Sequence, residues 1–193
     1  MLPFQIILHG FLLWASMGFL MPIGILVIRM SNREECERRL KIIFYVHATL
    51  QILSLLLVTV AAIMSIESFD NSFTNNHQRI GLALYGAIWL QAATGVYKPD
   101  RGSKGRSIWF PIHWLLGVTV SLLGINNIYT GLQNYHTRTL RSTSVWTLAF
   151  TVEIVVILFI YLLQEKWQYI KQIRSDLVNE TVTASELRNI FNR

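Results

Sequence analysis

The sequence predicts an all-α protein, a multi-pass bundle of five transmembrane helices. Apolar residues make up 52% of the 193 residues, and they gather in runs of about twenty, long enough to cross a bilayer core of about 30 Å. Backbone in lipid must satisfy its own hydrogen bonds, which favours helices. The net charge of +6 arises from basic residues in the connections between runs. This distribution indicates membrane topology and excludes a nucleic-acid partner.

The expected spans divide the chain into one membrane domain and one tail. The spans lie at residues 4–28, 42–66, 78–97, 108–133 and 145–163. Residues 1–165 form the membrane domain, and residues 166–193 form a polar tail. The lipid bilayer is therefore the first expected partner.

Basic residues set the expected orientation of the spans. Fourteen of the 17 lysines and arginines lie in the tail, between the first two spans, or between the third and fourth spans. The positive-inside rule places these three segments, and so the C-terminus, in the cytosol. Cys36 should then stay reduced, and the sequon Asn179-Glu180-Thr181 should carry no glycan.

The first two spans each contain one histidine. The first begins almost at Met1, without the short core and cleavage site of a signal peptide. It carries His9 near its outer end. After a charged connector at residues 31–40, the second span carries His47 a turn or two above its inner end. Gln51 follows one turn later and is expected to orient the imidazole or its ligand.

The third and fourth spans repeat this arrangement. His77 lies at the outer end of the third span, and His113 lies near the inner end of the fourth. A glycine follows each histidine by four residues, on the same helix face, which leaves space beside the imidazole. The second of these glycines opens a stripe at intervals of seven residues, made of Gly117, Gly124 and Gly131. Either helix packing or a flat cofactor on that face explains the stripe.

Depth sorts the four histidines into two pairs. His9 and His77 lie near the outer ends of their spans, and His47 and His113 lie near the inner ends. Each pair can supply two opposed nitrogens to one haem iron, and bis-histidine ligation suits electron transfer. No Cys-x-x-Cys-His motif is present, so two non-covalent haem b groups are expected. Zinc competes for imidazole, but four histidines in two layers cannot converge on one ion.

Three further polar residues, Arg79, Glu153 and His136, lie outside the histidine pairs. Arg79, the only basic residue near the outer end of the third span, meets an anionic substrate or a haem propionate, or else reaches lipid headgroups. Glu153 lies inside the last span and serves as a proton relay or makes a structural hydrogen bond. His136, past the fourth span, should be solvated. In the tail, Thr183-Ala184-Ser185-Glu186 has the form of a capping box that starts a short helix.

The stretches Leu8-His9-Gly10, Phe44-Tyr45-Val46-His47, His77-Gln78-Arg79-Ile80-Gly81 and Pro111-Ile112-His113 carry a resemblance. Together they resemble the cytochrome b561 family, in particular its plant members joined to a DOMON domain. The resemblance implies a di-haem b core with the pairing above. It also implies electron transfer from cytosolic ascorbate to an exoplasmic acceptor, either monodehydroascorbate or a ferric chelate. The family usually has six helices, and this sequence lacks the one before the first span, a DOMON domain and a secretory signal.

The same resemblance implies an inner ascorbate site. Arg106, seven residues before His113, matches a basic residue of that site. The lysine often found three residues before the second span's histidine is Phe44 here. Arg39 and Lys41 lie one or two turns lower and are expected to substitute for it in part. Besides ascorbate and the acceptor, a second copy of the chain is an open alternative as a partner.

Two alternatives to a di-haem oxidoreductase therefore remain. The first is a non-enzymatic haem-binding relay or assembly partner without a substrate site of its own. The absent DOMON domain, the missing helix and Phe44 favour it. The second is a proton or ion transporter that uses the histidines and Glu153. The spectrum before and after addition of ascorbate separates these alternatives, because a transporter would show no visible absorption.

Overall fold

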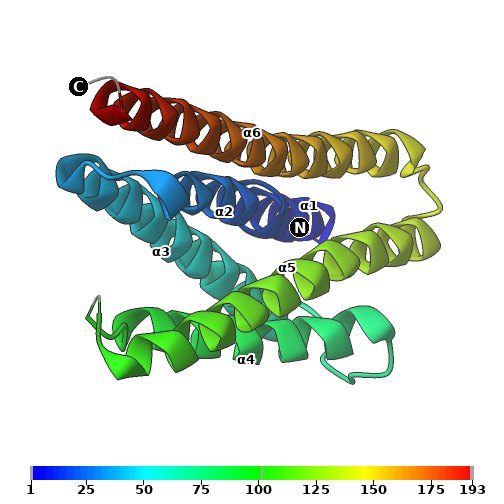
Figure 1. Cartoon of the computed structure of the whole chain (residues 1–193). Coiled ribbons are helices and arrows are strands. Elements are labelled where there is room, and N and C mark those ends of the chain that lie inside the picture. The colour runs from blue at the N-terminus through cyan, green and yellow to red at the C-terminus, as the bar shows by residue number, and fades with distance from the viewer. Residues whose placement is uncertain (1, 101, 192–193) are drawn as a thin grey trace.

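The computed structural model describes the backbone of residues 2–100 and 102–191 and most side chains of residues 4–181. All regular structure in these residues is helical. The elements are α1 (Leu2–Leu13), the π-helix η1 (Trp14–Leu20), α2 (Met21–Arg29), the 3₁₀-helix η2 (Met30–Arg33), α3 (Glu37–Ser68), α4 (Asn76–Val96), α5 (Lys104–Thr139) and α6 (Ser144–Phe191). Figure 1 shows α4 and α5 paired along one side, α6 along the opposite side beside α1 and α2, and α3 crossing between them.

Four helical stretches of the described chain are long and apolar enough to cross a membrane. They are Phe4–Asn32, Glu37–Ser68, Lys104–Thr139 and Ser144–Lys171. These stretches match four of the five predicted spans and indicate a multi-pass membrane protein. The predicted third span corresponds to α4, which has 21 residues but does not reach the same hydropathy. Its first turn is polar, and Gln91 interrupts its apolar sequence.

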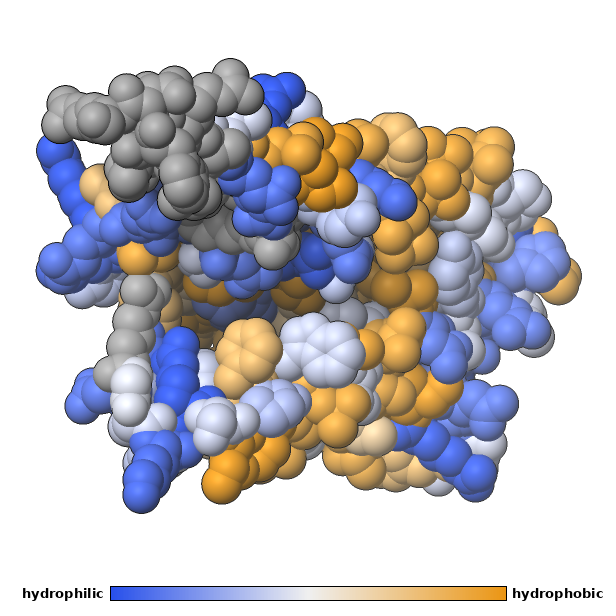
Figure 2. Space-filling model, in the orientation of Figure 1, coloured by the Kyte–Doolittle hydropathy of each residue, from blue (hydrophilic) through white to orange (hydrophobic). Residues whose placement is uncertain are grey.

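The connections between helices gather at the two ends of the bundle. The α2–α3 and α4–α5 connections lie at the same end as the C-terminal end of α6, and the other two connections lie at the opposite end (Figure 1). This is the grouping that the basic residues predict. Hydrophobic residues cover the middle of the surface in Figure 2, and hydrophilic residues gather toward both ends. The bundle thus presents an apolar belt of the kind that contacts lipid.

The core lies where η1, α3, α4 and α5 meet. Its buried apolar residues are Leu13, Met17, Met21, Val58, Ala61, Leu84, Ile88 and Val120. The side chain of Met17 fills the position that a Cβ on Gly124 would occupy, since that Cβ would lie 2.6 Å from the Met17 Cε. The absence of a side chain at Gly124 therefore lets the first span approach α5 at mid-height.

The first span contains a π-helix that the sequence pattern does not predict. In η1 the Met21 N–H bonds to the carbonyl of Ser16, five residues back. The Ser16 carbonyl also accepts from the Ser54 hydroxyl at 3.0 Å, and the two buried hydroxyl oxygens lie 2.8 Å apart. Pro22 has no N–H to continue the regular ladder. These contacts place the wider turn here and join the first span to α3.

The last span and the tail form one continuous helix, which differs from the prediction of a separate short helix. No glycine or proline interrupts the sequence from Ser144 to Phe191, so the helix continues past the apolar run. The residues Thr183–Glu186 lie inside α6 rather than at the start of a new helix. The side chain of Asn179, in the predicted unglycosylated sequon, lies outside the described residues.

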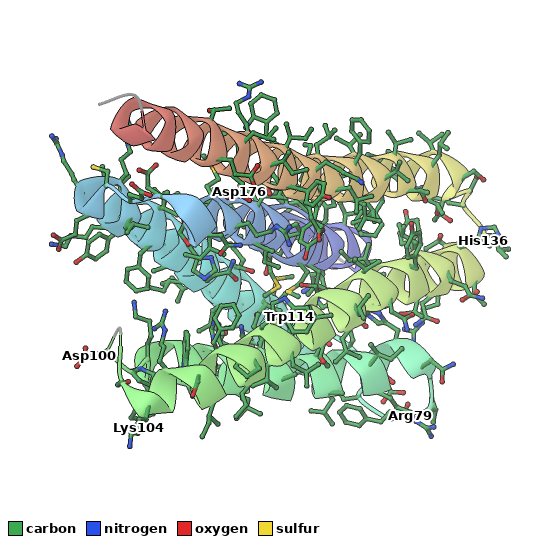
Figure 3. All side chains as sticks on the ribbon, viewed as in Figure 1. Arg79, Asp100, Lys104, Trp114, His136 and Asp176 are labelled. Carbon is green, nitrogen blue, oxygen red and sulfur yellow. The ribbon has the colours of Figure 1, made fainter. Side chains whose placement is uncertain are left out.

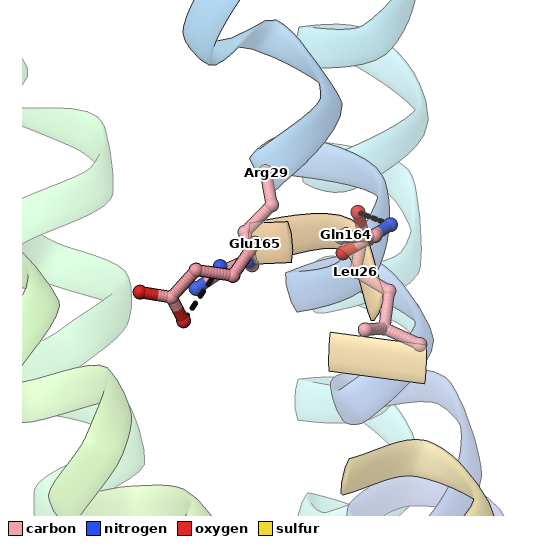
Figure 4. Close-up of polar contacts among 4 residues, drawn as sticks. All are labelled: Leu26, Arg29, Gln164 and Glu165. Atoms are coloured by element: carbon pink, nitrogen blue, oxygen red, sulfur yellow. Dashed lines mark hydrogen bonds and ion pairs between the residues drawn. The ribbon is translucent and has the colours of Figure 1, made fainter. Parts of the chain in front are cut away.

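Helix α6 is attached to the bundle by a few polar contacts. At the end shown in Figure 4, the Gln164 amide donates to the Leu26 carbonyl at 3.1 Å, and Arg29 lies 3.8 Å from Glu165. The Arg29 guanidinium also lies 3.5 Å from the ring centroid of Tyr161. Further along, the Trp14 indole N–H donates to Glu153 at 2.7 Å. The carboxylate inside the last span is therefore hydrogen-bonded between helices.

Replacing Glu153 by leucine should destabilise the protein. The Trp14 indole N–H would lose its partner, and an unpaired donor costs about 1–3 kcal/mol. Chemical denaturation in detergent should show that loss in the free energy of unfolding. Glu153→Gln retains an acceptor and should lose much less. Glu165→Gln, at an exposed ion pair, is a control expected to change stability by about 1 kcal/mol or less. Wild-type stability of Glu153→Leu would contradict the structural role of the contact.

Candidate paired-histidine centre

The structure brings His9 and His77 together at one end of the bundle. Their ring centroids are 6.2 Å apart, and the ring planes make an angle of 84°. An imidazole nitrogen binds a metal at about 2.0 Å, so two rings opposed across one ion have centroids about 6 Å apart. Each ring can turn about its own metal–nitrogen axis, so the angle between planes is compatible with this arrangement. The pair predicted from depth therefore has the separation of two axial ligands.

Backbone carbonyls hold both imidazoles of this outer pair. The Nδ1 of His9 lies 3.0 Å from the carbonyl oxygen of Ala61 on α3, and the Nδ1 of His77 lies 3.1 Å from that of Asn127 on α5. A carbonyl only accepts, so Nδ1 carries the proton in each ring. Nε2 then bears the lone pair that a metal needs. This tautomer, fixed by a hydrogen bond at the second nitrogen, is typical of histidines that bind metals.

At the opposite end of the bundle lie His47, near the start of α3, and His113, near the start of α5. His47 resembles the outer pair, because its Nδ1 lies 2.8 Å from the carbonyl oxygen of Gly24 on α2. His113 differs: its Nδ1 lies 2.8 Å from the Thr94 hydroxyl oxygen, and its Nε2 lies 3.3 Å from the Gln91 amide nitrogen. Trp109 stacks on the His113 ring, with centroids 4.8 Å apart and planes at 13°.

The glycine stripe of α5 receives side chains from neighbouring helices. A Cβ on Gly117 would lie 3.1 Å from the Gln91 amide nitrogen, and a Cβ on Gly131 would lie 3.1 Å from the His77 Cε1. The space at Gly81, four residues after His77, faces the Asn127 side chain at 3.5 Å. The stripe therefore serves packing, and at Gly131 it lets a paired histidine approach the α5 backbone closely.

Three residues near the histidines have contacts that the sequence does not predict. Gln51 donates to the Met21 carbonyl at 3.2 Å instead of contacting His47. Arg79 donates through Nε to the Phe73 carbonyl at 2.9 Å, and its side chain is exposed. His136 is exposed as expected, but it lies in the last turn of α5 and its Nδ1 contacts the Arg141 carbonyl at 2.7 Å.

The basic residues predicted at the inner end have two different environments. Arg39 and Lys41 are exposed and lie 3.6 Å from Glu34 and 2.9 Å from Glu37. Arg106 instead lies 4.5 Å from the ring centroid of Trp109, the residue stacked on His113, and donates to the Pro99 carbonyl at 3.1 Å. The guanidinium, the indole and the imidazole thus form a row from the connection to the paired histidines.

Sequence reasoning missed one cation at this end. The Lys98 ammonium lies 3.6 Å from the ring centroid of Phe44, one turn before His47. The lysine thus approaches from the end of α4 the position on α3 where the resemblance leads one to expect a lysine. The two residues are 54 positions apart, so no local sequence pattern indicates that they meet. The sequence shows only that the α4–α5 connection is basic.

Comparison with known proteins identifies the family of the chain. A family model described as eukaryotic cytochrome b561 matches residues 8–139, a stretch that contains all four paired histidines. The chain belongs to the cytochrome b561 family. A cytochrome b561 domain-containing protein of Arabidopsis thaliana is 46% identical over 171 residues, which cover 88% of this chain and 66% of the relative. A cytochrome b561 and DOMON domain-containing protein of the same plant is 30% identical over 169 residues, which cover 86% of this chain and 34% of the relative.

Membership in the cytochrome b561 family implies haem b, and the donor set at the outer pair fits that group. A haem iron has two axial positions, which two neutral imidazoles fill. Among the described residues, no group of three or more His, Cys, Asp or Glu side chains is arranged to hold a metal ion in the way that structural zinc sites do.

Proposed function

We propose that this chain transfers electrons across a membrane through two haem b groups, one held by His9 and His77 and the other by His47 and His113. The observation that carries the proposal is the separation of the His9 and His77 rings, 6.2 Å, together with the hydrogen bonds that leave Nε2 as the ligating nitrogen. When bound, the haems supply reversible one-electron redox chemistry. Membership in the cytochrome b561 family supports the same function.

The protein's own part is to hold two redox groups at different depths. The hydrogen bonds from Nδ1 orient three of the four imidazoles before any ligand binds, which lowers the reorganisation that binding requires. The buried apolar core between the pairs, with Met17 and Val120 at its centre, excludes water from the space between them. Paired histidines at both ends of the bundle would thus define a path through it.

We propose that α4 is the fifth span. Its 21 residues correspond to about 32 Å of helix at 1.5 Å per residue, the thickness of the hydrocarbon core. It packs along α5, and the side chains of His77, Gln91 and Thr94 point to that helix. A helix whose polar residues are satisfied by a neighbour can cross a membrane despite a lower mean hydropathy. With five spans, the basic connections favour a cytosolic C-terminal end of α6.

For the inner end we propose an anionic donor of the ascorbate class, bound by Lys98 and Arg106. Both cations lie over aromatic rings next to paired histidines, Lys98 over Phe44 and Arg106 over Trp109. Arg39 and Lys41 already lie beside carboxylates, so we assign them no part in donor binding. The outer acceptor is proposed to be monodehydroascorbate or a ferric chelate. Arg79 marks the outer end (Figure 3).

The visible spectrum of the purified full chain tests the proposal. We expect b-type absorption that changes to the reduced form when ascorbate is added. A folded protein that purifies without haem absorption would overturn the proposal. Haem that ascorbate does not reduce would favour the second candidate, a haem-binding relay without a substrate site. The carboxylates beside Arg39 and Lys41 favour that candidate.

Transport of electrons across the membrane needs a separate assay. Vesicles that contain the protein and are loaded with ascorbate should reduce an external ferric chelate. Ascorbate-loaded vesicles without the protein should not. Haem reduction without reduction of the chelate would limit the protein to the inner half of the reaction.

A further inference from the structure

His113 differs from the other three paired histidines in what holds its ring. Backbone carbonyls of Ala61, Gly24 and Asn127 accept from the Nδ1 of His9, His47 and His77. The Nδ1 of His113 contacts a side chain instead, the hydroxyl of Thr94 at 2.8 Å. This hydroxyl is the only one of the four Nδ1 partners that a side-chain substitution can remove.

The direction of the hydrogen bond follows from the other contacts of Thr94. Its hydroxyl donates to the Gln91 carbonyl at 2.7 Å, which uses its single proton. The hydroxyl oxygen can therefore only accept from His113, so the imidazole proton lies on Nδ1.

A second connection fixes the position of Thr94 relative to His113. The Trp109 indole N–H donates to the Thr94 carbonyl at 2.7 Å, and the same indole stacks on the His113 ring. Helices α4 and α5 are thus joined through Thr94 at two points, its hydroxyl and its carbonyl.

We propose that Thr94 is a positioning residue that fixes the tautomer of His113 and raises its electron-donating strength toward the inner haem. The inference rests on the proposed function. A hydrogen-bond acceptor at Nδ1 makes an imidazole a more basic ligand. A more basic axial ligand stabilises the oxidised over the reduced iron, one of the levers by which a protein sets a haem potential. Thr94 therefore lowers the reduction potential of the inner haem and leaves that of the outer haem unchanged.

Redox titration of the purified full chain tests this inference with three variants. Thr94→Val has nearly the same shape and no acceptor; one of the two potentials should shift to a more positive value, and the other should stay. Thr94→Ser retains the hydroxyl and should titrate as wild type. Thr119→Val is the matched control, because Thr119 bonds only to its own helix through the Leu115 carbonyl and faces outward. Its potentials should be those of wild type.

Haem retention gives a second readout. Loss of an outer-shell partner typically weakens a metal site by about 10- to 100-fold, so Thr94→Val should release one haem at lower competitor concentrations of apomyoglobin than wild type. If Thr94→Val does not accumulate, Thr94→Ala removes the same hydroxyl with less steric demand and carries the same expectation.

The outcomes distinguish failure of the proposed function from failure of the inference about Thr94. A wild-type protein without b-type absorption overturns the proposed function and this inference together. Two haems in wild type with identical potentials in Thr94→Val and Thr119→Val overturn the inference alone. A shift in both potentials of Thr94→Val also overturns it, because that result indicates a general disturbance of the bundle.

Discussion

His77→Ala should remove about half of the haem absorption of the purified protein, because under the proposed function each of two haems needs both of its imidazoles. The ring of His77 is held on two sides. Its Nδ1 is bonded to Asn127, and its ring lies against Gly131. The variant leaves a cavity but no strained contact, so the bundle should still fold. His113→Ala should remove the other half, and the double variant should be colourless.

His136→Ala is the matched control for this result. His136 lies on α5 near the same end of the bundle as Arg79, which follows His77 by two residues (Figure 3). It is exposed and also contacts a carbonyl through Nδ1. It has no facing histidine among the described contacts and should retain the full absorption. Absorption measured against protein concentration gives the haem content directly. Full haem content in His77→Ala, or a loss in His136→Ala, would contradict the assignment of the outer pair.

Lys98→Gln should slow the reduction of the haem by ascorbate. A charge-assisted contact contributes about 1.5–3 kcal/mol, which corresponds to a loss of roughly 10- to 100-fold in the apparent second-order rate constant. Arg106→Gln should act in the same direction, because its guanidinium lies over Trp109 beside His113. Lys98→Arg keeps both the charge and a cation over Phe44 and should retain most of the rate.

Stopped-flow reduction measures these rates, and Lys104→Gln is the control. Lys104 is exposed at the start of α5, at the same end of the bundle, so its removal changes the net charge equally (Figure 3). Its effect should be small and should disappear at high salt. Reduction by dithionite should be unchanged in all variants. Equal rates for Lys98→Gln and Lys104→Gln would show that only the general charge of this end matters.

The approach of His9 and His77 could be predicted from the sequence because depth in a membrane follows directly from position in an apolar run. Both histidines lie near the same end of spans that run in the same direction, and their rings come within 6.2 Å. Membrane helices have few possible relative heights, so counting residues along each run is enough to estimate depth. Four of the five predicted spans are helices long and apolar enough to cross a membrane, and they could be predicted for the same reason.

The partners of these histidines could not be predicted in this way. Three of them are backbone carbonyls, at Ala61, Gly24 and Asn127. Every residue has a carbonyl, so no residue type reveals which one a neighbouring helix will present. Thr94 does have a distinctive side chain, but its contact depends on the rotation of α4 about its axis. In the first span, the π-turn at Ser16 adds one residue to a turn and so rotates the following residues about the helix axis.

The contacts of the basic residues near His47 and His113 could not be predicted from the sequence either. Arg39 and Lys41 are expected from the sequence to substitute in part for the lysine that Phe44 replaces, but the sequence does not indicate that they lie beside the carboxylates of Glu34 and Glu37. Lys98 reaches Phe44 from another helix, and only the folded arrangement of the α4–α5 connection brings it there. The length of α6 could not be predicted either. The apolar run predicts a span at residues 145–163, but the helix continues to Phe191.

The carbonyl partners make the tautomer of three histidines independent of the side chains at the partner positions. Space still limits what these positions accept, because Ala61 and Asn127 are buried and a Cβ on Gly24 would lie against the Gln51 amide. Any residue that fits there keeps the accepting oxygen, whereas at Thr94 the acceptor disappears with the side chain. In a large library of variants, the tautomer should therefore survive every tolerated substitution at the three carbonyl positions and should be lost with the hydroxyl at position 94.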